Sequence, residues 1–281
     1  MSVRAAESLL EDGVRPEEIV LVDNGSGDES CELFRRTFPG SVVLCEATNV
    51  GFAAGNNLGA AARPAKRYLF VNSDAFVARK GSVDRLVSAL DDPGVGAAVP
   101  LLFNDDSTVQ PSVSPLRTPG VALVQATGLS RFIPDRFQPD WSTHWSHDHS
   151  RDVQNAVGAV IAVDGEVWEQ LGGFDESTFM YGEDLDLFWR IRLNGSRVRF
   201  VHDSSFVHLG NASGAPPNAG RAERVARADA TTIRRHLPPH RAALTIGFEL
   251  AGHVARLGYF RLVGAAGRAD TSRGAIRGLR P

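Results

Sequence analysis

In the stretch EEIVLVDNGSGD, residues 17–28, a run of apolar residues ends abruptly in a polar turn. The run from Ile19 to Val22 is typical of a short buried strand. SVVLC (41–45) and RYLFVNSD (67–74) repeat the pattern, and helical segments lie between the runs. Short apolar strands that alternate with helices predict βαβ units, so we expect an α/β fold with a mostly parallel sheet.

A polar turn follows each of these strands directly, as DNGSGD (23–28), TNVGF (48–52) and NSDAF (72–76). Ligands of open α/β sheets bind beyond the carboxyl ends of the strands, so three such turns predict a nucleotide site. Asx chemistry alone also produces turns of this kind. Asp74, at the tip of its strand, suits either a divalent cation or a turn cap.

Charge is distributed unevenly along the 281 residues, although the net charge is only −3. From Arg221 onward there are 12 arginines and 4 acids, a formal charge of +8, which leaves −11 for the rest. We therefore expect a main domain over 1–220 and a basic helical extension over 221–281. A basic extension suits an anionic membrane or nucleic acid, and no nucleic-acid motif accompanies it.

Cys31 and Cys45 are the only cysteines, and no CxxC motif exists, which excludes a zinc ribbon. This usage favours two buried thiols in a reducing cytosol. The first ten residues lack the apolar core of a signal peptide, and no run of 18 uncharged apolar residues is present. We therefore expect a cytoplasmic protein, held at most peripherally on the inner face of the cell membrane.

The stretch YGEDLDLFWR (181–190) crowds three carboxylates at the start of an expected helix, roughly 183–194. Acids at this end suit the helix dipole, but capping needs one acid rather than three. Neighbouring carboxylates raise one another's pKa, which suits a general base. Asp184 and Asp186 point about 200° apart, so one can face a cleft while Asp186 pairs with Arg190.

Histidines in two places are further candidates for metal ligands. His208 follows the last expected strand and suits either a metal ligand or an ordinary packed residue. His144, His147, Asp148 and His149 cluster in a loop without regular ligand spacing. We interpret that cluster as an acceptor-contacting or solvated loop rather than a metal site.

Five segments together resemble, in order and spacing, the family 2 inverting glycosyltransferases of the GT-A fold, and in particular their bacterial rhamnosyltransferase-like branch. The segments are VDNGSGD (22–28), NVGFAAGNN (49–57), FVNSD (70–74), GGFDESTFMYGEDLDLFWRIR (172–192) and VHLGNASG (207–214). The resemblance implies a Rossmann-like sheet with a nucleotide-sugar-binding half over 1–102 and an acceptor-binding half over 103–220.

The resemblance also assigns roles to the matching positions. Asp184 matches the catalytic base, with Glu183 beside it. The donor-binding positions are Asp23, Asn24, Asn49, Gly51, Asn57, Asn72 and Asp74. The acceptor-binding positions are Gly158, Ala159 and Asp186. Asp74, with His208, would hold Mg²⁺ or Mn²⁺.

The implied reaction is a single displacement at the anomeric carbon, which inverts its configuration. The favoured donor is dTDP-rhamnose, followed by UDP-sugars. The implied acceptor is a hydroxyl of a glycan or of a polyprenyl-diphosphate-linked sugar, in cell-envelope polysaccharide synthesis.

The chain departs from the family's pattern in two places. The first strand of the sheet, which the family places ahead of the opening helix, is apparently missing, so we expect either a start further upstream or an inactive sugar-nucleotide-binding remnant. Val163 and Asp164 stand where the family often has two arginines, which argues against acceptor phosphate contact there. Nucleotidyl transfer, a third interpretation, lacks a glycine-rich basic triphosphate loop.

Within the extension, Leu244 to Val263 has apolar residues at helical spacing, with Arg256 and Arg261 among them. Two interpretations stay open. The helix either packs on the catalytic domain or lies on an anionic lipid surface, where it would assist a lipid-linked acceptor.

Overall fold

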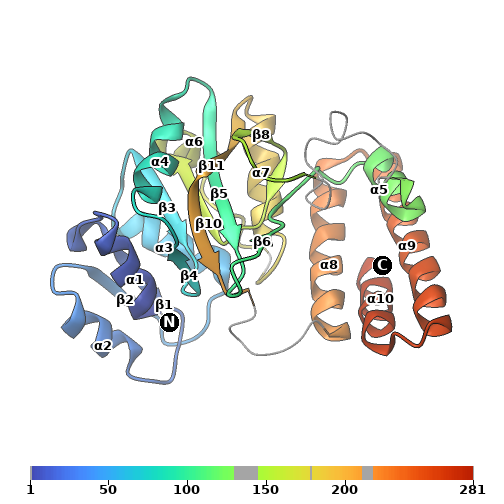
Figure 1. The fold of residues 1–281 in the computed structure, drawn as a ribbon, viewed down its shortest axis with the longest axis horizontal. Coiled ribbons are helices and arrows are strands. Elements are labelled where there is room, and N and C mark those ends of the chain that lie inside the picture. Colours follow the sequence, from blue (N-terminus) through green and yellow to red (C-terminus); the bar gives the residue numbers. More distant parts are fainter. Residues whose placement is uncertain (1, 130–144, 178, 211–217, 281) are drawn as a thin grey trace. The chain divides into compact units, whose positions relative to one another are not determined.

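The computed structural model describes residues 2–129, 145–177, 179–210 and 218–280 (Figure 1). These residues divide into two compact units, each described by itself. The sheet unit comprises the described residues of Met1–Val113 and Ser146–Gly210, and the helical unit those of Ser114–Trp145 and Asn211–Pro281.

The sheet unit has the predicted α/β class, with helices on both faces of a central sheet. Its helices are α1 (Ser2–Glu11), α2 (Ser30–Thr37), α3 (Phe52–Ala62), α4 (Ser82–Ser88), α6 (Gly165–Leu171) and α7 (Glu183–Leu193). Its longer strands are β1 (Val20–Asp23), β2 (Val42–Cys45), β3 (Arg67–Val71), β4 (Ala75–Val77), β5 (Val95–Phe103), β10 (Val160–Asp164) and β11 (Arg197–His208). Shorter strands are β6 (Val109–Gln110), β7 (Val113–Ser114), β8 (Arg151–Val153) and β9 (Asn155–Ala156).

The central sheet has the strand order β3-β10-β5-β11-β4, with β6 beside β5 and β8 beside β11. β5 and β11 are parallel, whereas β10 runs antiparallel to both of its neighbours and β4 antiparallel to β11. The side chains along each strand alternate between the two faces of the sheet. Leu69 and Val71 of β3 join a core cluster that includes Leu86 of α4. Phe70 points to the other face, where its ring lies 4.6 Å from Trp168 of α6.

β1 and β2 form a separate parallel pair. The sequence predicts buried strands here, but β1 is only half-buried, and so is most of β3. The physical reason is that, among the described residues, β1 pairs only with β2 and β3 only with β10, so each has an open edge. Ahead of β1 the described chain holds α1 and the short turn Pro16–Glu18 but no strand.

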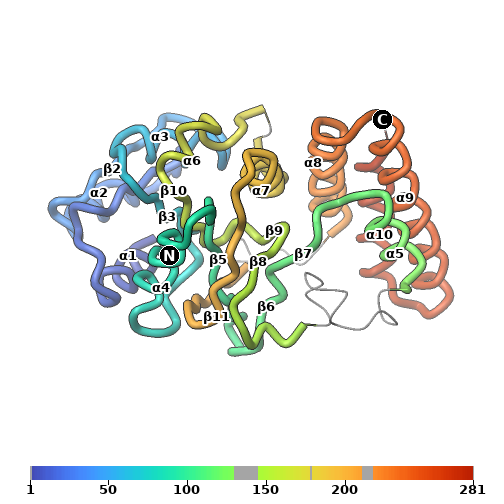
Figure 2. The backbone as a smooth tube through the Cα atoms, turned by 90° about the horizontal axis from the view of Figure 1, so that it is seen from above, coloured from blue at the N-terminus to red at the C-terminus, as the bar shows by residue number. Residues whose placement is uncertain are grey.

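The helical unit contains α5 (Pro119–Thr127), α8 (Ala219–His236), α9 (Pro239–Leu262) and α10 (Ala266–Leu279). Figure 2 shows α5 beside α9. α10 approaches α8 so closely that a Cβ at Gly274 would lie 1.9 Å from the carbonyl oxygen of Ala219. The unit differs from the extension expected from the sequence, because α5 belongs with the three C-terminal helices. The helix predicted over 244–263 is α9, and it packs on the helices of its own unit.

No helix within the described ranges combines the length and the apolar character needed to cross a bilayer.

Candidate active site

The turns that follow β1 and β2 are joined to each other by hydrogen bonds. Asn24, directly after β1, donates from Nδ2 to the carbonyl of Gly51 at 2.9 Å, and its Oδ1 accepts from the N–H of Val50 at 2.8 Å. Asn49 Oδ1 accepts from the N–H of Gly51 at 2.9 Å. Gly51 has a φ of 95° and precedes α3, and a Cβ there would lie 2.6 Å from the carbonyl oxygen of Phe179. The turn therefore requires glycine and contacts the segment that leads into α7.

Asn57 uses its amide to hold α3 against the turn before α7. Its Nδ2 donates to the carbonyl of Phe174 at 2.9 Å and to Glu176 Oε1 at 2.7 Å, and its Oδ1 accepts from the N–H of Phe174 at 2.9 Å. These contacts give Asn57 a positioning role, and its contact with a donor stays a prediction.

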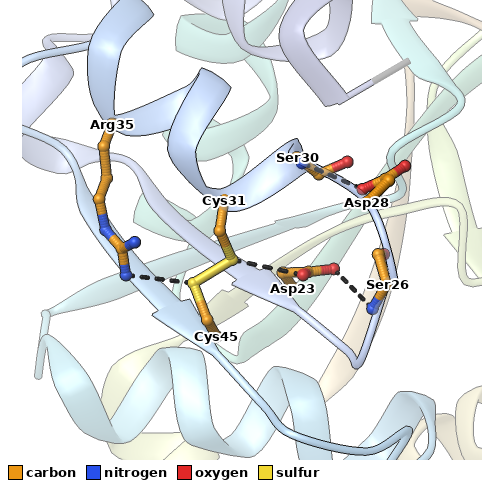
Figure 3. Close-up of a disulfide and its surroundings, with 7 residues drawn as sticks. All are labelled: Asp23, Ser26, Asp28, Ser30, Cys31, Arg35 and Cys45. Carbon is orange, nitrogen blue, oxygen red and sulfur yellow. Dashed lines mark hydrogen bonds between the residues drawn. A yellow bond between two sulfur atoms is a disulfide. The ribbon is translucent and has the colours of Figure 1, made fainter.

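A disulfide between Cys31 and Cys45 lies beside Asp23, as Figure 3 shows. The expectation of two buried thiols is wrong, because α2 places Cys31 against the end of β2, and Cys45 is exposed. Asp23 is the register partner of Cys45 across the two parallel strands. Its Oδ2 lies 3.3 Å from Cys31 Sγ, and its Oδ1 accepts from the N–H of Ser26 at 3.2 Å. Asp23, which is predicted to contact the nucleotide base, thus lies in a turn that the disulfide holds in place.

Asp74 and His208, distant in sequence, are brought together by the pairing of β4 with β11. Asp74 Oδ1 lies 3.6 Å from His208 Nε2, and the carbonyl of Asp74 accepts from the N–H of Leu209 at 3.1 Å. Gln110, which the sequence analysis missed, places Oε1 2.7 Å from His208 Nδ1. With Nδ1 donating to that oxygen, Nε2 presents its lone pair toward Asp74.

The oxygen of Asp74 and the nitrogen of His208 fit a cation that takes only part of its coordination shell from the protein. No group of three or more His, Cys, Asp or Glu side chains suited to a metal occurs in the described part of the chain. Mg²⁺ commonly takes only one or two protein carboxylates, and substrate phosphates and water complete its shell. His144 lies outside the described residues, and Asp148 pairs instead with its neighbour His149.

The three carboxylates at the start of α7 have three different environments. Asp184 Oδ2 accepts from the N–H of Gly158 at 3.0 Å, and its Oδ1 lies 2.8 Å from the N–H of Leu185. Asp186 is 2% exposed and pairs with Arg190 at 2.6 Å, the alternative that the sequence analysis describes. Arg190 also donates to the carbonyls of Leu171 and Gly173, so it holds α7 on the turn after α6.

Glu183 is the perturbed member of this group. It is 7% exposed, and its Oε2 has no hydrogen-bond partner among the described residues. Burial, the larger cause, and the negative charge of Asp184, the smaller one, together raise the pKa of Glu183 to about 7. A buried carboxyl that titrates near neutrality beside a second carboxylate is characteristic of acid–base sites.

The Gly158-Ala159 turn connects the segment that carries Asp184 with the segment that carries Asp74. Gly158 contacts Asp184, while the carbonyl of Ala159 accepts from the N–H of Asn72 at 2.9 Å, two residues before Asp74. Ala159 is fully buried, and Asp164 caps α6 through its Oδ1. The contacts of Ala159, Asp164 and Asp186 are thus structural, and acceptor binding by Ala159 and Asp186 stays a prediction.

The chain is similar to known proteins in sequence and in fold. Residues 3–147 match the profile described as glycosyl transferase family 2, and residues 102–231 match glycosyl transferase family group 2. The N-acetylglucosaminyl-diphospho-decaprenol L-rhamnosyltransferase of Mycobacterium tuberculosis is 27% identical over 69% of this chain and 67% of its own length. The O-antigen biosynthesis protein RfbC of Myxococcus xanthus is 30% identical over 75% of this chain but only 16% of its own length.

Among solved structures, the mannosyltransferase PcManGT of Pyrobaculum calidifontis, in complex with GDP-Man and Mn²⁺, is similar with a TM-score of 0.60. The similarity covers 99% of this chain and 84% of that chain, at 17% sequence identity. At this identity the likeness concerns the fold.

Proposed function

The chain belongs to glycosyltransferase family 2, and from this premise we propose that it transfers a sugar with inversion, using Asp184 as the catalytic base. The observation that carries the proposal is the contact between Asp184 and the Gly158 N–H, which fixes one carboxylate oxygen. A base needs a fixed position within hydrogen-bond reach of the proton it removes.

In the proposed reaction, the acceptor hydroxyl gives its proton to the Asp184 carboxylate as its oxygen bonds to the anomeric carbon. The bond between that carbon and the diphosphate oxygen breaks, and its electron pair leaves with the nucleoside diphosphate. One displacement of this kind inverts the anomeric centre. Glu183, with its pKa of about 7, carries a proton over much of the range below neutrality. A neutral Glu183 adds no second negative charge beside the carboxylate of Asp184.

Donor binding is proposed for the edge where β1 and β3 end. Asp23 would accept from a base N–H, and the turn that contains Asn49 and Gly51 would face the diphosphate, while Asn24, Asn57 and Asn72 hold these turns in place. Asp74 and His208 would hold Mg²⁺ or Mn²⁺, which when bound neutralises charge on the diphosphate. The complex of PcManGT with GDP-Man and Mn²⁺ supports this proposal by analogy of fold.

For the substrates, we propose dTDP-rhamnose as donor and a glycan or polyprenyl-diphosphate-linked sugar as acceptor, in cell-envelope polysaccharide synthesis. The support is the mycobacterial relative, whose name describes an L-rhamnosyltransferase that acts on an N-acetylglucosaminyl-diphospho-decaprenol. A lipid-linked acceptor would place the enzyme at the inner face of the cell membrane.

A thermal-shift panel tests the proposed donor. dTDP-rhamnose, UDP-N-acetylglucosamine and GDP-mannose are added separately with Mn²⁺ or Mg²⁺. A ligand at a hundred times its Kd stabilises the folded chain by about 2.7 kcal/mol. We expect dTDP-rhamnose to raise the melting temperature most. If none of the nucleotide sugars changes the melting temperature, the proposed donor site is wrong.

A further inference from the structure

The outer side of α9 and the turn after it expose apolar side chains to solvent. Leu262 is 88% exposed, and Leu244, Val254, Tyr259 and Val263 are each more than half exposed. Leu244, Ala251, Ala255, Gly258 and Leu262 follow one another at intervals of three, four or seven residues, so they form one stripe along the helix. We call these residues, together with three further apolar residues and three arginines, the α9 face. The further residues are Val254, Tyr259, Val263, Arg241, Arg261 and Arg268.

The opposite side of α9 is already used inside the helical unit. Ala242, Thr245, Glu249 and Gly252 are buried. A Cβ at Gly252 would lie 2.9 Å from the Cα of Ala126 in α5, which shows how closely the two helices pack. The packing that holds α9 in the unit therefore does not involve the α9 face.

Every charged side chain on the α9 face is positive. Arg241, Arg261 and Arg268 are exposed. The one acid in the sequence from Pro239 to Ala269 is Glu249. Glu249 points inward, where Arg117 donates to it at 3.0 Å and also pairs with Asp229 of α8 at 2.9 Å. The α9 face thus combines apolar and cationic groups, and the next acid along the chain, the half-exposed Asp270 of α10, pairs with Arg273.

We propose that the α9 face docks on the surface of a bilayer that contains anionic lipids, with α9 lying in the plane of the interface. Leucine, valine and tyrosine side chains would enter the boundary between headgroups and acyl chains, while the arginines pair with lipid phosphates. The charge complementarity favours a lipid surface over a second copy of this chain, because two copies of a cationic face repel. The proposal deepens the proposed function, since it supplies a route to a lipid-linked acceptor.

Co-sedimentation with vesicles tests the docking. The full chain is mixed at low salt with phosphatidylcholine vesicles, or with phosphatidylcholine vesicles that also contain phosphatidylglycerol. We expect binding to the anionic vesicles, release at high salt and weak binding to pure phosphatidylcholine. Leu262→Asp should weaken binding by about tenfold or more, which corresponds to about 1.4 kcal/mol. Leu193→Asp is the matched control, because Leu193 is 69% exposed but lies in the sheet unit, and it should bind like the unmodified chain.

The arginines are tested separately. Each of Arg241→Ala, Arg261→Ala and Arg268→Ala should lower binding to anionic vesicles by about fivefold and flatten its salt dependence. Unchanged melting temperatures would show that these surface variants fold.

Two results would overturn the docking proposal. One is a chain that stays in the supernatant with anionic vesicles at low salt. The other is a dimer in sedimentation velocity that Leu262→Asp converts to a monomer, which would assign the face to a second copy of the chain. Donor binding, measured without vesicles, distinguishes failure of docking from failure of the proposed glycosyl transfer.

Discussion

Asp184 and Gly158 are joined by a hydrogen bond of 3.0 Å from the backbone N–H of Gly158 to Oδ2 of Asp184. The bond connects the first turn of α7 with the turn that enters β10. Because the carbonyl of the next residue, Ala159, accepts a hydrogen bond from the backbone N–H of Asn72, the same turn also contacts the segment that carries Asp74. The position of the proposed base thus depends on a residue that has no side chain.

Gly158→Ala should therefore impair the chemical step. The added Cβ would lie 2.9 Å from Asp184 Cβ and 3.2 Å from its Oδ2, so the carboxylate must move. Misplacement of a reacting group by about 1 Å can cost about a hundredfold in rate. We expect a fall in kcat of that order with little change in donor Kd. Gly120→Ala is the control, because a Cβ at Gly120 meets nothing within 4 Å. Equal kcat values for the two variants would contradict the positioning role.

The pKa of Glu183 predicts a pH dependence of stability. The pKa of this group is raised to about 7 in the folded chain, from 4.5 in a model peptide. Between these values the folded chain holds a proton that the unfolded chain has lost, so stability is highest below pH 4.5 and declines until about pH 7. The decline from this group is on the order of 3 kcal/mol.

Glu183→Gln should remove that part of the decline, so the variant gains stability over the unmodified chain as pH rises from 5 to 8. Urea unfolding at several pH values measures the difference. The comparison with the variant is needed because burial also raises the pKa of Glu249. Parallel pH profiles for the two chains would show that Glu183 has an ordinary pKa.

Cation binding is predicted to depend on Asp74, His208 and Gln110. Asp74→Asn should abolish the stabilisation that Mn²⁺ adds in the presence of a nucleoside diphosphate. Gln110→Ala removes the group that orients the His208 ring, and loss of such a partner costs about ten- to a hundredfold in metal affinity. Isothermal titration with Mn²⁺ measures both effects. Asp203→Asn, which changes an exposed carboxylate, is the control. Unchanged Mn²⁺ affinity in Asp74→Asn would rule out this metal site.

The disulfide predicts a dependence of stability on reductant. Cys31 and Cys45 are 14 residues apart, and a bridge across a loop of that size contributes about 3 kcal/mol. The oxidised chain should present no free thiol, since both cysteines are paired, and dithiothreitol should lower its urea midpoint. The Cys31→Ser, Cys45→Ser double variant should not respond to the reductant. Two titratable thiols in the untreated chain would show that the bridge is absent.

Much of the site follows from the sequence, because its determinants are local. Polar turns after apolar strands predict which residues lie at the sheet edge, and α7 begins at Glu183 as expected. Helical spacing alone predicts the pairing of Asp186 with Arg190. The order of five motifs predicts the family, although no single motif does.

The remaining features depend on tertiary packing and have no local signal. The disulfide requires α2 to place Cys31 against the end of β2, and Gln110 reaches His208 from a two-residue strand. Burial of Glu183, which raises its pKa, depends on the fit of α7 against its neighbours. The helical unit includes α5 because that helix packs on α9, more than a hundred residues later in the chain.

The most direct test of the account compares nucleoside diphosphate release by the unmodified chain and by Asp184→Asn. Both chains are supplied with acceptor, Mn²⁺ and the donor that gives the largest thermal shift. Loss of a general base costs about 10² to 10⁴ in rate, so we expect a fall of that size with an unchanged donor-induced thermal shift. Equal rates in the two chains would contradict the assignment of Asp184 as the base, and with it the proposed mechanism.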